Sequence, residues 1–82
     1  MKILITGGCG FIGSNYILNK SLNSDCLILN YDNLTYAGNK ENLSIIESSK
    51  NYTFIKGDIC DFDSLSKAIN NFQPEAIIHF AA

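Results

Sequence analysis

The sequence is short of the residues that bind nucleic acids and anionic membranes. Its 82 residues include no arginine, and its six basic residues, all lysines, are outnumbered by eight acidic ones, which gives a net charge of −2. A chain without the guanidinium fork and with a slight negative excess is a poor ligand for phosphate backbones. We therefore expect neither nucleic acid nor a membrane among its partners.

Cysteine, histidine and long apolar runs are also sparse. Cys9, Cys26 and Cys60 lie far apart, form no Cys-x-x-Cys pair, and have only His79 to help complete a metal site. This pattern predicts reduced thiols and no metal. No run approaches the roughly 20 apolar residues of a spanning helix, and residues 3–5 are too short a run for a signal-peptide core. We expect a cytoplasmic protein.

What the sequence does contain is enough apolar residues to fold, with 46% hydrophobic and 17% charged residues. Short, nearly continuous apolar runs at residues 3–5, 26–29, 52–55 and 76–80 predict strands that are covered on both faces. Helical spacing separates these runs. The helical positions are Ile12, Tyr16 and Ile17, a weaker candidate over residues 40–49, and Leu65, Ile69 and Phe72 behind Asp61 as N-cap.

Alternation of strands and helices predicts an α/β fold, a Rossmann-type doubly wound parallel sheet of strand order 3-2-1-4. The fourth strand would be an edge only because the chain stops at Ala82. Ile77 and Ile78 point to opposite faces there, and an open apolar edge invites pairing with another chain. We expect residues 1–82 to be the N-terminal part of a larger Rossmann domain, with the rest of that domain and a substrate domain absent from this chain. We also expect the isolated chain to self-associate through this strand.

The strongest motif is Thr-Gly-Gly-Cys-Gly-Phe-Ile-Gly at residues 6–13, which follows a predicted strand and opens a predicted helix. It contains Gly8-x-Gly10-x-x-Gly13 and, in another register, Gly7-x-x-Gly10-x-x-Gly13. Glycine allows the tight turn, the approach of a pyrophosphate to backbone N–H groups, and close packing of the helix. Free N–H groups and the positive dipole end stabilise an anion there. The motif predicts a dinucleotide site.

Asp32 ends the second predicted strand and follows Gly13 by 19 residues, close to the spacing of about 20 expected for a ribose-binding acid. Its carboxylate can accept hydrogen bonds from both ribose hydroxyls and would repel a 2′-phosphate. We therefore predict NAD rather than NADP as the cofactor. The alternative is an aspartate that only caps a helix or a turn.

Asp58 follows the third predicted strand, at the sheet edge that borders the ligand crevice in open α/β sheets. It could bind the adenine amino group while Ile59 packs on the ring. The alternative is a loop residue that caps the next helix, a role that Asp61 already fills.

Residues after the fourth predicted strand, Phe80, Ala81 and Ala82, would pass the middle of the cofactor, where small side chains leave room. We interpret His79 as a strand residue whose hydrogen bonds are satisfied in the sheet, rather than as a catalyst.

The motifs at residues 6–13, 57–61 and 79–82, in this order, resemble the extended short-chain dehydrogenase/reductase family. Within that family, residues 31–39 are most similar to the nucleotide-sugar 4,6-dehydratases. The resemblance spans all 82 residues but only a third or less of a typical family chain. Cys9 departs from the family, which often has alanine there.

The resemblance implies roles for matching residues, all of them in binding NAD. The cofactor phosphates would lie on the backbone of Phe11 and Ile12, with the adenosine ribose on Asp32, Asn33, Leu34 and Thr35, the adenine on Asp58 and Ile59, and the nicotinamide side on Phe80, Ala81 and Ala82. For the full-length parent it implies a homodimeric lyase. In that reaction the sugar is oxidised at C4, water is lost across C5 and C6, and the hydride returns to C6.

Catalysis in this family uses a Tyr-x-x-x-Lys pair, with both side chains on one helical face beside the nicotinamide. We expect no such pair in this chain, which would then be inactive alone, its catalytic residues lying beyond Ala82. Three strings match by spacing only: Tyr16/Lys20, Tyr36/Lys40 and Tyr52/Lys56.

Two alternatives stay open. The chain could belong to another extended family member, such as a nucleotide-sugar epimerase or decarboxylase. It could also be a short, non-catalytic module that binds NAD or a partner.

Overall fold

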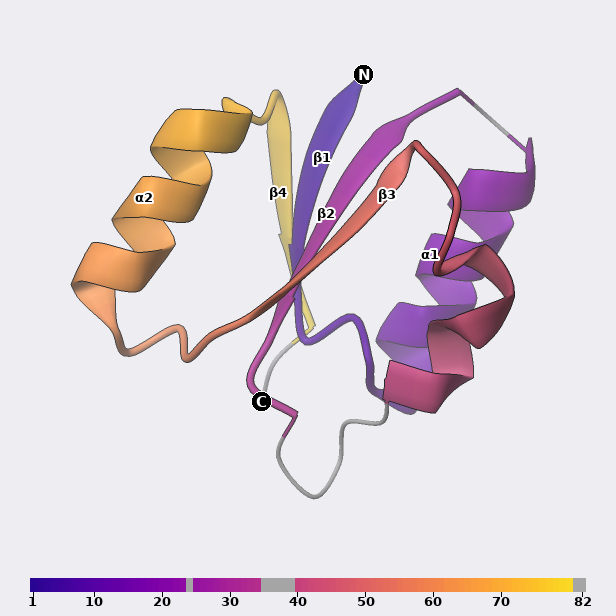
Figure 1. Ribbon diagram of the computed structural model, residues 1–82, viewed down its shortest axis with the longest axis horizontal. Coiled ribbons are helices and arrows are strands. Elements are labelled where there is room, and N and C mark those ends of the chain that lie inside the picture. Colours follow the sequence, from indigo (N-terminus) through magenta and orange to yellow (C-terminus); the bar gives the residue numbers. More distant parts are fainter. Residues whose placement is uncertain (24, 35–39, 81–82) are drawn as a thin grey trace.

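The computed structural model describes residues 1–23, 25–34 and 40–80, and its backbone alternates strands and helices. Four parallel strands form one sheet in the order β3-β2-β1-β4 (Figure 1). This confirms the predicted Rossmann-type order. The elements are β1 (Lys2–Thr6), α1 (Phe11–Asn23), β2 (Leu27–Asp32), the 3₁₀ helix η1 (Lys40–Ile46), β3 (Tyr52–Lys56), α2 (Phe62–Phe72) and β4 (Ala76–His79).

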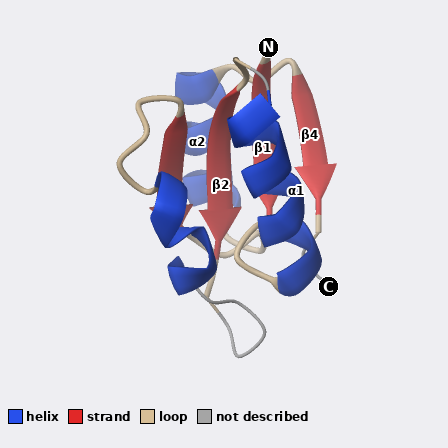
Figure 2. Cartoon of the chain, turned by 90° about the vertical axis from the view of Figure 1, so that its right-hand side faces the viewer, coloured by secondary structure: helices blue, strands red, loops and turns tan. Residues whose placement is uncertain are grey.

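β1 lies inside the sheet, paired with β2 on one side and β4 on the other. Its residues Ile3, Leu4 and Ile5 are at most 2% exposed. Successive side chains of a strand point to opposite faces, so the continuous apolar run at 3–5 reflects coverage of both faces. Figures 1 and 2 show α1 and η1 on one face and α2 on the other.

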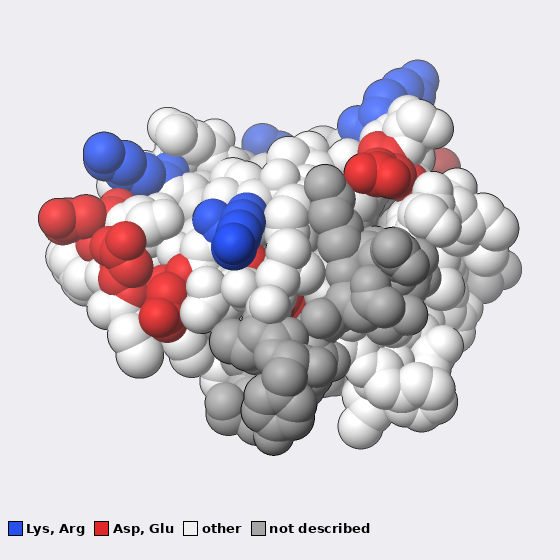
Figure 3. All heavy atoms as spheres, turned by 60° about the horizontal axis from the view of Figure 1, so that its bottom comes forward, with Lys and Arg blue, Asp and Glu red and all other residues white. Residues whose placement is uncertain are grey.

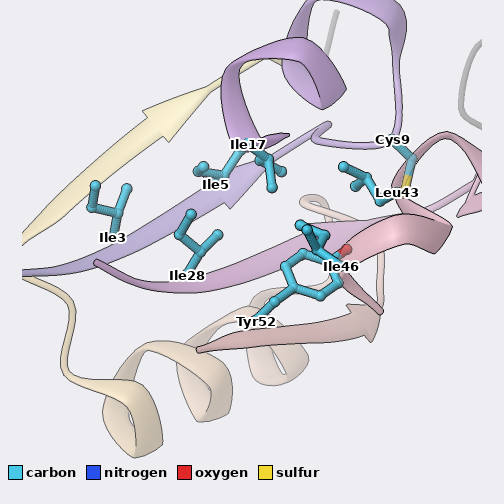
Figure 4. Close-up of a cluster of buried hydrophobic side chains, with 8 residues drawn as sticks. All are labelled: Ile3, Ile5, Cys9, Ile17, Ile28, Leu43, Ile46 and Tyr52. Carbon is cyan, nitrogen blue, oxygen red and sulfur yellow. The ribbon is translucent and has the colours of Figure 1, made fainter. Parts of the chain in front are cut away.

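Two apolar clusters fill the space between the sheet and these helices. The cluster on the α1 side (Figure 4) consists of Ile3, Ile5, Cys9, Ile17, Ile28, Leu43, Ile46 and Tyr52. The cluster on the α2 side consists of Leu4, Leu29, Tyr31 and Ala68, with Ile55, Leu65, Ile69 and Phe72 packed against it. Alternate residues of β1 and β2 therefore serve different cores.

α2 begins and ends at residues that satisfy its terminal backbone groups. The Asp61 side chain accepts a hydrogen bond from the Ser64 N–H at 3.2 Å, as the N-cap prediction required. At the other end Gln73 is left-handed, with φ of 52°, and its N–H donates to the Ile69 carbonyl at 2.8 Å. These caps define where α2 begins and ends along the chain.

The segment at 40–49 and the first turn of α1 differ from the expected helices. The segment is a 3₁₀ helix that ends at Ile46, with a break at Leu43 where φ is −116°. Leu43 and Ile46 nevertheless both reach the core, where they are 1% and 5% exposed. In α1, Ile17 is fully buried, whereas Ile12 is 69% exposed. The first turn of α1, which contains Ile12, lies at the carboxyl ends of the strands (Figure 1).

β4 is an edge strand of the described sheet, and its side chains alternate between half-buried and exposed. Ile78 packs against the α1-side cluster, while Ile77 is 56% exposed. Self-association through this edge stays a prediction.

The N-cap of α2 gives a test of local stability. Asp61→Ala should lower the free energy of unfolding by about 1 kcal/mol, because it leaves the Ser64 N–H without its acceptor. Asp61→Asn, which keeps a side-chain oxygen, is the matched control and should stay close to the unsubstituted protein in urea unfolding. Equal losses in both variants would contradict the cap assignment.

Candidate functional site

The carboxyl ends of the parallel strands and the first turns of α1 and α2 lie at one edge of the molecule (lower part of Figure 1). Ligands of open α/β sheets bind at this edge, outside the strand ends. Most of the residues singled out from the sequence lie here. Thr35, Ala81 and Ala82 lie outside the described residues.

The glycine turn between β1 and α1 starts with a left-handed residue, Gly7, whose φ is 74°. L side chains rarely adopt this conformation, which explains glycine at this position. The Gly7 N–H donates to the Tyr31 carbonyl of β2 at 3.2 Å, and the Gly10 N–H donates back to the Gly7 carbonyl at 3.3 Å. The turn is thus tied to the sheet and closed on itself.

Gly8 and Gly13 are needed for close packing. A Cβ on Gly8 would lie 2.3 Å from Asn30 Oδ1 and 2.4 Å from Ile17 Cδ1. A Cβ on Gly13 would lie 2.6 Å from the Gly7 carbonyl oxygen, a backbone atom that cannot move without moving the turn. Gly13 therefore lets α1 pack against its own turn, whereas the sequence predicted close packing of the helix on the sheet.

Asp32, at the end of β2, is joined directly to the glycine turn. The residue is 7% exposed, and its Oδ2 accepts a hydrogen bond from the Cys9 N–H at 2.7 Å. Oδ1 accepts from the Leu34 N–H at 2.8 Å, which supports the left-handed Leu34, with φ of 55°. The turn and the acid, distant in sequence, therefore form one site. Asn33 beside them is exposed.

Asn30 is a functional candidate that the sequence reasoning missed. Its side chain is fully buried, and Oδ1 accepts a hydrogen bond from the Gly8 N–H at 3.1 Å. A signal was present, since an asparagine interrupts the apolar run of β2 two positions before Asp32, on the same face of the strand. Polar residues inside a buried strand need partners.

The start of α1 offers backbone N–H groups toward the strand ends. The first intrahelical bond runs from the Ser14 N–H to the Gly10 carbonyl at 2.8 Å, so the N–H groups before Ser14 precede the helical ladder. Phe11 and Ile12 are 79% and 69% exposed, and the first turn of α1 contains no acidic residue. An anion can therefore approach this helix end.

The start of α2, at the same edge, has the opposite character. Asp61 caps it and Asp63 lies in its first turn. On the face seen in Figure 3, most acidic side chains gather on the left, where α2 lies in Figure 1. These carboxylates would repel an anion at the start of α2, so the start of α1 is the better anion site.

Asp58 and Ile59 lie in the loop between β3 and α2. Asp58 is exposed, and its Oδ1 accepts a hydrogen bond from the Cys60 N–H at 2.9 Å. The buried Tyr31 hydroxyl donates to the Asp58 carbonyl at 3.1 Å, and Gly57 packs so closely on the Tyr31 ring that a Cβ would lie 2.3 Å away. Ile59 is 38% exposed. The loop has a fixed base and an open outer face.

The end of β4 lies beside α1. Phe80 follows the strand, and its ring centroid is 5.6 Å from that of Tyr16 on α1. The His79 Nδ1 atom is hydrogen bonded to the Thr6 hydroxyl. This bond agrees with the interpretation of His79 as a strand residue with a partner in the sheet.

The Tyr-x-x-x-Lys strings differ in their settings. Tyr16 and Lys20 lie on α1, behind the glycine turn, whereas Tyr52 and Lys56 lie on β3. Tyr52 is 7% exposed and its hydroxyl contacts Asn30. Tyr36 lies outside the described residues.

Within residues 1–23, 25–34 and 40–80, the structure contains no cluster of histidine, cysteine and acidic side chains that could hold a metal ion. In the same ranges, no helix combines the length and apolarity needed to span a membrane.

A strand, a glycine turn, a helix and an acid at the end of the next strand define a Rossmann-type α/β domain. Residues 4–82 match the family described as GDP-mannose 4,6 dehydratase, and the chain belongs to this family.

The chain is 48% identical to the dTDP-glucose 4,6-dehydratase of Salmonella typhimurium and 44% identical to dTDP-glucose 4,6-dehydratase 1 of Escherichia coli K12. These matches cover all of this chain but only 23% of each relative. The resemblance of this chain to the dTDP-glucose 4,6-dehydratases is thereby confirmed.

Solved structures agree. The dTDP-glucose 4,6-dehydratase of Bacillus anthracis, in complex with NAD, has a TM-score of 0.88 and 42% identity over 100% of this chain and 27% of that one. A double mutant of the Streptomyces venezuelae enzyme, with NAD bound, has a TM-score of 0.92 and 36% identity over 100% and 26%. The UDP-Glc/GlcNAc 4-epimerase of Campylobacter jejuni is also similar, with a TM-score of 0.84 and 36% identity over 99% and 24%.

The buried Tyr52 gives a pH-dependent test of the site. Burial raises the pKa of Tyr52 above its ordinary value of 10.0, and although the hydrogen bond from Asn30 lowers it, nearby Cys9, Glu47 and Asp32 raise it further. Above about pH 10 the unfolded chain loses the Tyr52 proton while the folded chain keeps it, so stability falls as pH rises. In Tyr52→Phe, the free energy of unfolding measured with denaturant should fall less steeply between about pH 9 and about pH 11 than in the unsubstituted protein. Superimposable pH slopes for the two proteins would contradict the raised pKa.

Proposed function

We propose that this chain is the NAD-binding part of a dTDP-glucose 4,6-dehydratase, corresponding to the N-terminal portion of such an enzyme. The observation that carries the proposal is the hydrogen bond of 2.7 Å between the Asp32 carboxylate and the Cys9 N–H, which joins the glycine turn and the acid into one site. The dehydratases of Bacillus anthracis and Streptomyces venezuelae, similar in fold and sequence, were solved with NAD.

The residues present fit a dinucleotide. The N–H groups of Gly7, Gly8 and Cys9 are bound to β2, by the Tyr31 carbonyl and by the side chains of Asn30 and Asp32. The Gly10 N–H donates to the Gly7 carbonyl at 3.3 Å. The pyrophosphate is therefore assigned to the N–H groups of Phe11 and Ile12, which follow Gly10 at the positive end of α1. Gly10, directly before these two residues, has no Cβ atom that could block the approach of a pyrophosphate.

The adenosine end of NAD is assigned to Asp32 and the residues after it. Each carboxylate oxygen accepts one protein N–H, and each has a second lone pair for a ribose hydroxyl. A 2′-phosphate would meet this carboxylate, which favours NAD over NADP. By resemblance to the family, the ribose is further assigned to Asn33, Leu34 and Thr35, the adenine to Asp58 and Ile59, and the nicotinamide side to Phe80, Ala81 and Ala82.

NAD supplies an acceptor for a hydride that is later returned, so the net reaction converts dTDP-glucose to dTDP-4-keto-6-deoxyglucose and water. This chain's contribution is to bind and orient the cofactor. We propose that it carries no catalytic residue, because Tyr16 lies behind the glycine turn and Tyr52 is buried against Asn30. The catalytic pair and any dimer contacts would then belong to the remainder of the enzyme.

The cofactor assignment is tested by Asp32→Asn. The variant keeps only one side-chain oxygen, so it can accept from the Leu34 N–H or from the Cys9 N–H but not from both. It also loses the charge that binds ribose hydroxyls, so NAD affinity should fall about 10- to 100-fold. NADP affinity, weak already, should hardly change. Isothermal titration measures both.

Asp25→Asn is the matched control, since it removes the same charge from an exposed position before β2, at the other end of the strand. It should bind NAD as the unsubstituted protein does. Equal losses for NAD and NADP in Asp32→Asn would argue against the ribose assignment.

The reaction assignment is tested by mixing the purified 82-residue chain with NAD and dTDP-glucose and following the loss of water from the sugar by mass spectrometry. We expect NAD binding without turnover. Turnover by residues 1–82 alone would show that a catalytic group lies within them and would refute the division of labour proposed here.

A further inference from the structure

The buried side chain of Asn30 has no role in the cofactor contacts described above, yet it lies directly under the glycine turn. It is fully buried, and a Cβ on Gly8 would come within 2.3 Å of its Oδ1 atom. This oxygen accepts a hydrogen bond from the Gly8 N–H at 3.1 Å. The glycine turn therefore packs directly against the amide of Asn30, with no room for a side chain between them.

The other end of the amide is held by a residue of the next strand. Asn30 Nδ2 donates to the hydroxyl of Tyr52, on β3, at 3.1 Å, and lies 3.4 Å from Cys9 Sγ. An amide has acceptors at one end and donors at the other. The Gly8 N–H can only donate, so it requires the Oδ1 end of Asn30, and the Tyr52 hydroxyl, which accepts from Nδ2, holds the amide in that orientation. Figure 4 shows Tyr52 and Cys9 as members of one buried cluster.

The energetic consequence follows from burial. A buried N–H group left without an acceptor costs about 1–3 kcal/mol, and the turn could reduce this cost only by lifting away from β2 toward water. Gly8 lies three residues before Phe11, so such a movement would displace the N–H groups at the start of α1. Asn30 thus acts on the anion site without touching the anion.

We propose that Asn30 is a positioning residue that holds the glycine turn in the shape that binds a diphosphate, and that the Tyr52 hydroxyl orients its amide. The inference rests on the proposed NAD function and adds to it a second layer of residues, Asn30 and Tyr52, drawn from two neighbouring strands.

The test compares Asn30→Leu, Tyr52→Phe and Ala68→Gly in the purified protein. Asn30→Leu keeps the side-chain size but removes the acceptor, so NAD affinity should fall about tenfold or more. In the absence of NAD, the Gly8 amide hydrogen should exchange faster with solvent, as measured by NMR. Tyr52→Phe removes only the orienting contact and should weaken NAD binding about threefold, within the range for one hydrogen bond.

Ala68→Gly is the stability control. Ala68 is buried in the α2-side cluster, on the opposite face of the sheet from Asn30. Its replacement lowers helix stability by about 1 kcal/mol without touching the glycine turn. At a temperature where all variants are folded, it should leave both NAD affinity and Gly8 exchange unchanged.

The outcomes separate cleanly. Unchanged NAD affinity or unchanged Gly8 exchange in Asn30→Leu would overturn the inference while leaving the proposed function standing. Equal losses in Ala68→Gly would also overturn it, because they would reflect general destabilisation. If Asn30→Leu does not fold, Tyr52→Phe decides by the same two measurements. Failure of the unsubstituted protein to bind NAD would overturn the proposed function and the inference with it.

Discussion

The site depends on how one strand holds one turn. Three consecutive N–H groups, of Gly7, Gly8 and Cys9, are bound by β2 through the Tyr31 carbonyl and the side chains of Asn30 and Asp32. Buried backbone donors must have acceptors, and here the acceptors of one strand supply all three. The same bonds bring the helix start and the acid together, so folding of the sheet and assembly of the candidate cofactor site are one event.

The sheet order, α2 with its cap, and the pairing of the glycine turn with Asp32 could all be predicted from the sequence. Each depends on a local pattern: continuous apolar runs, helical spacing behind Asp61, and glycines at fixed offsets. Asn30 was missed because its partners, Gly8 and Tyr52, are each 22 residues away and meet it only after the strands pair. The 3₁₀ form of η1 was missed because Leu43 and Ile46 fit either kind of helix.

Similarity in fold does not by itself separate the reactions of this family. A 4-epimerase and two dehydratases overlay on 99–100% of this chain with TM-scores of 0.84 to 0.92. Folds host many chemistries, and function resides in the site. What favours a dehydratase is sequence identity, 48% and 44% to the curated dehydratases, together with residues 31–39, which resemble that branch of the family.

The parallel register of β2 has a consequence for folding fidelity. Asn30 and Asp32 lie on one face of the strand and Tyr31 on the other, where it joins the α2-side cluster. A slip of one residue would turn every side chain of β2 to the wrong side of the sheet. Tyr31 would then face the glycine turn, and a carboxylate and an amide would enter an apolar core. The polar residues that build the site therefore also destabilise a misaligned sheet, and they do so whether or not a ligand is bound.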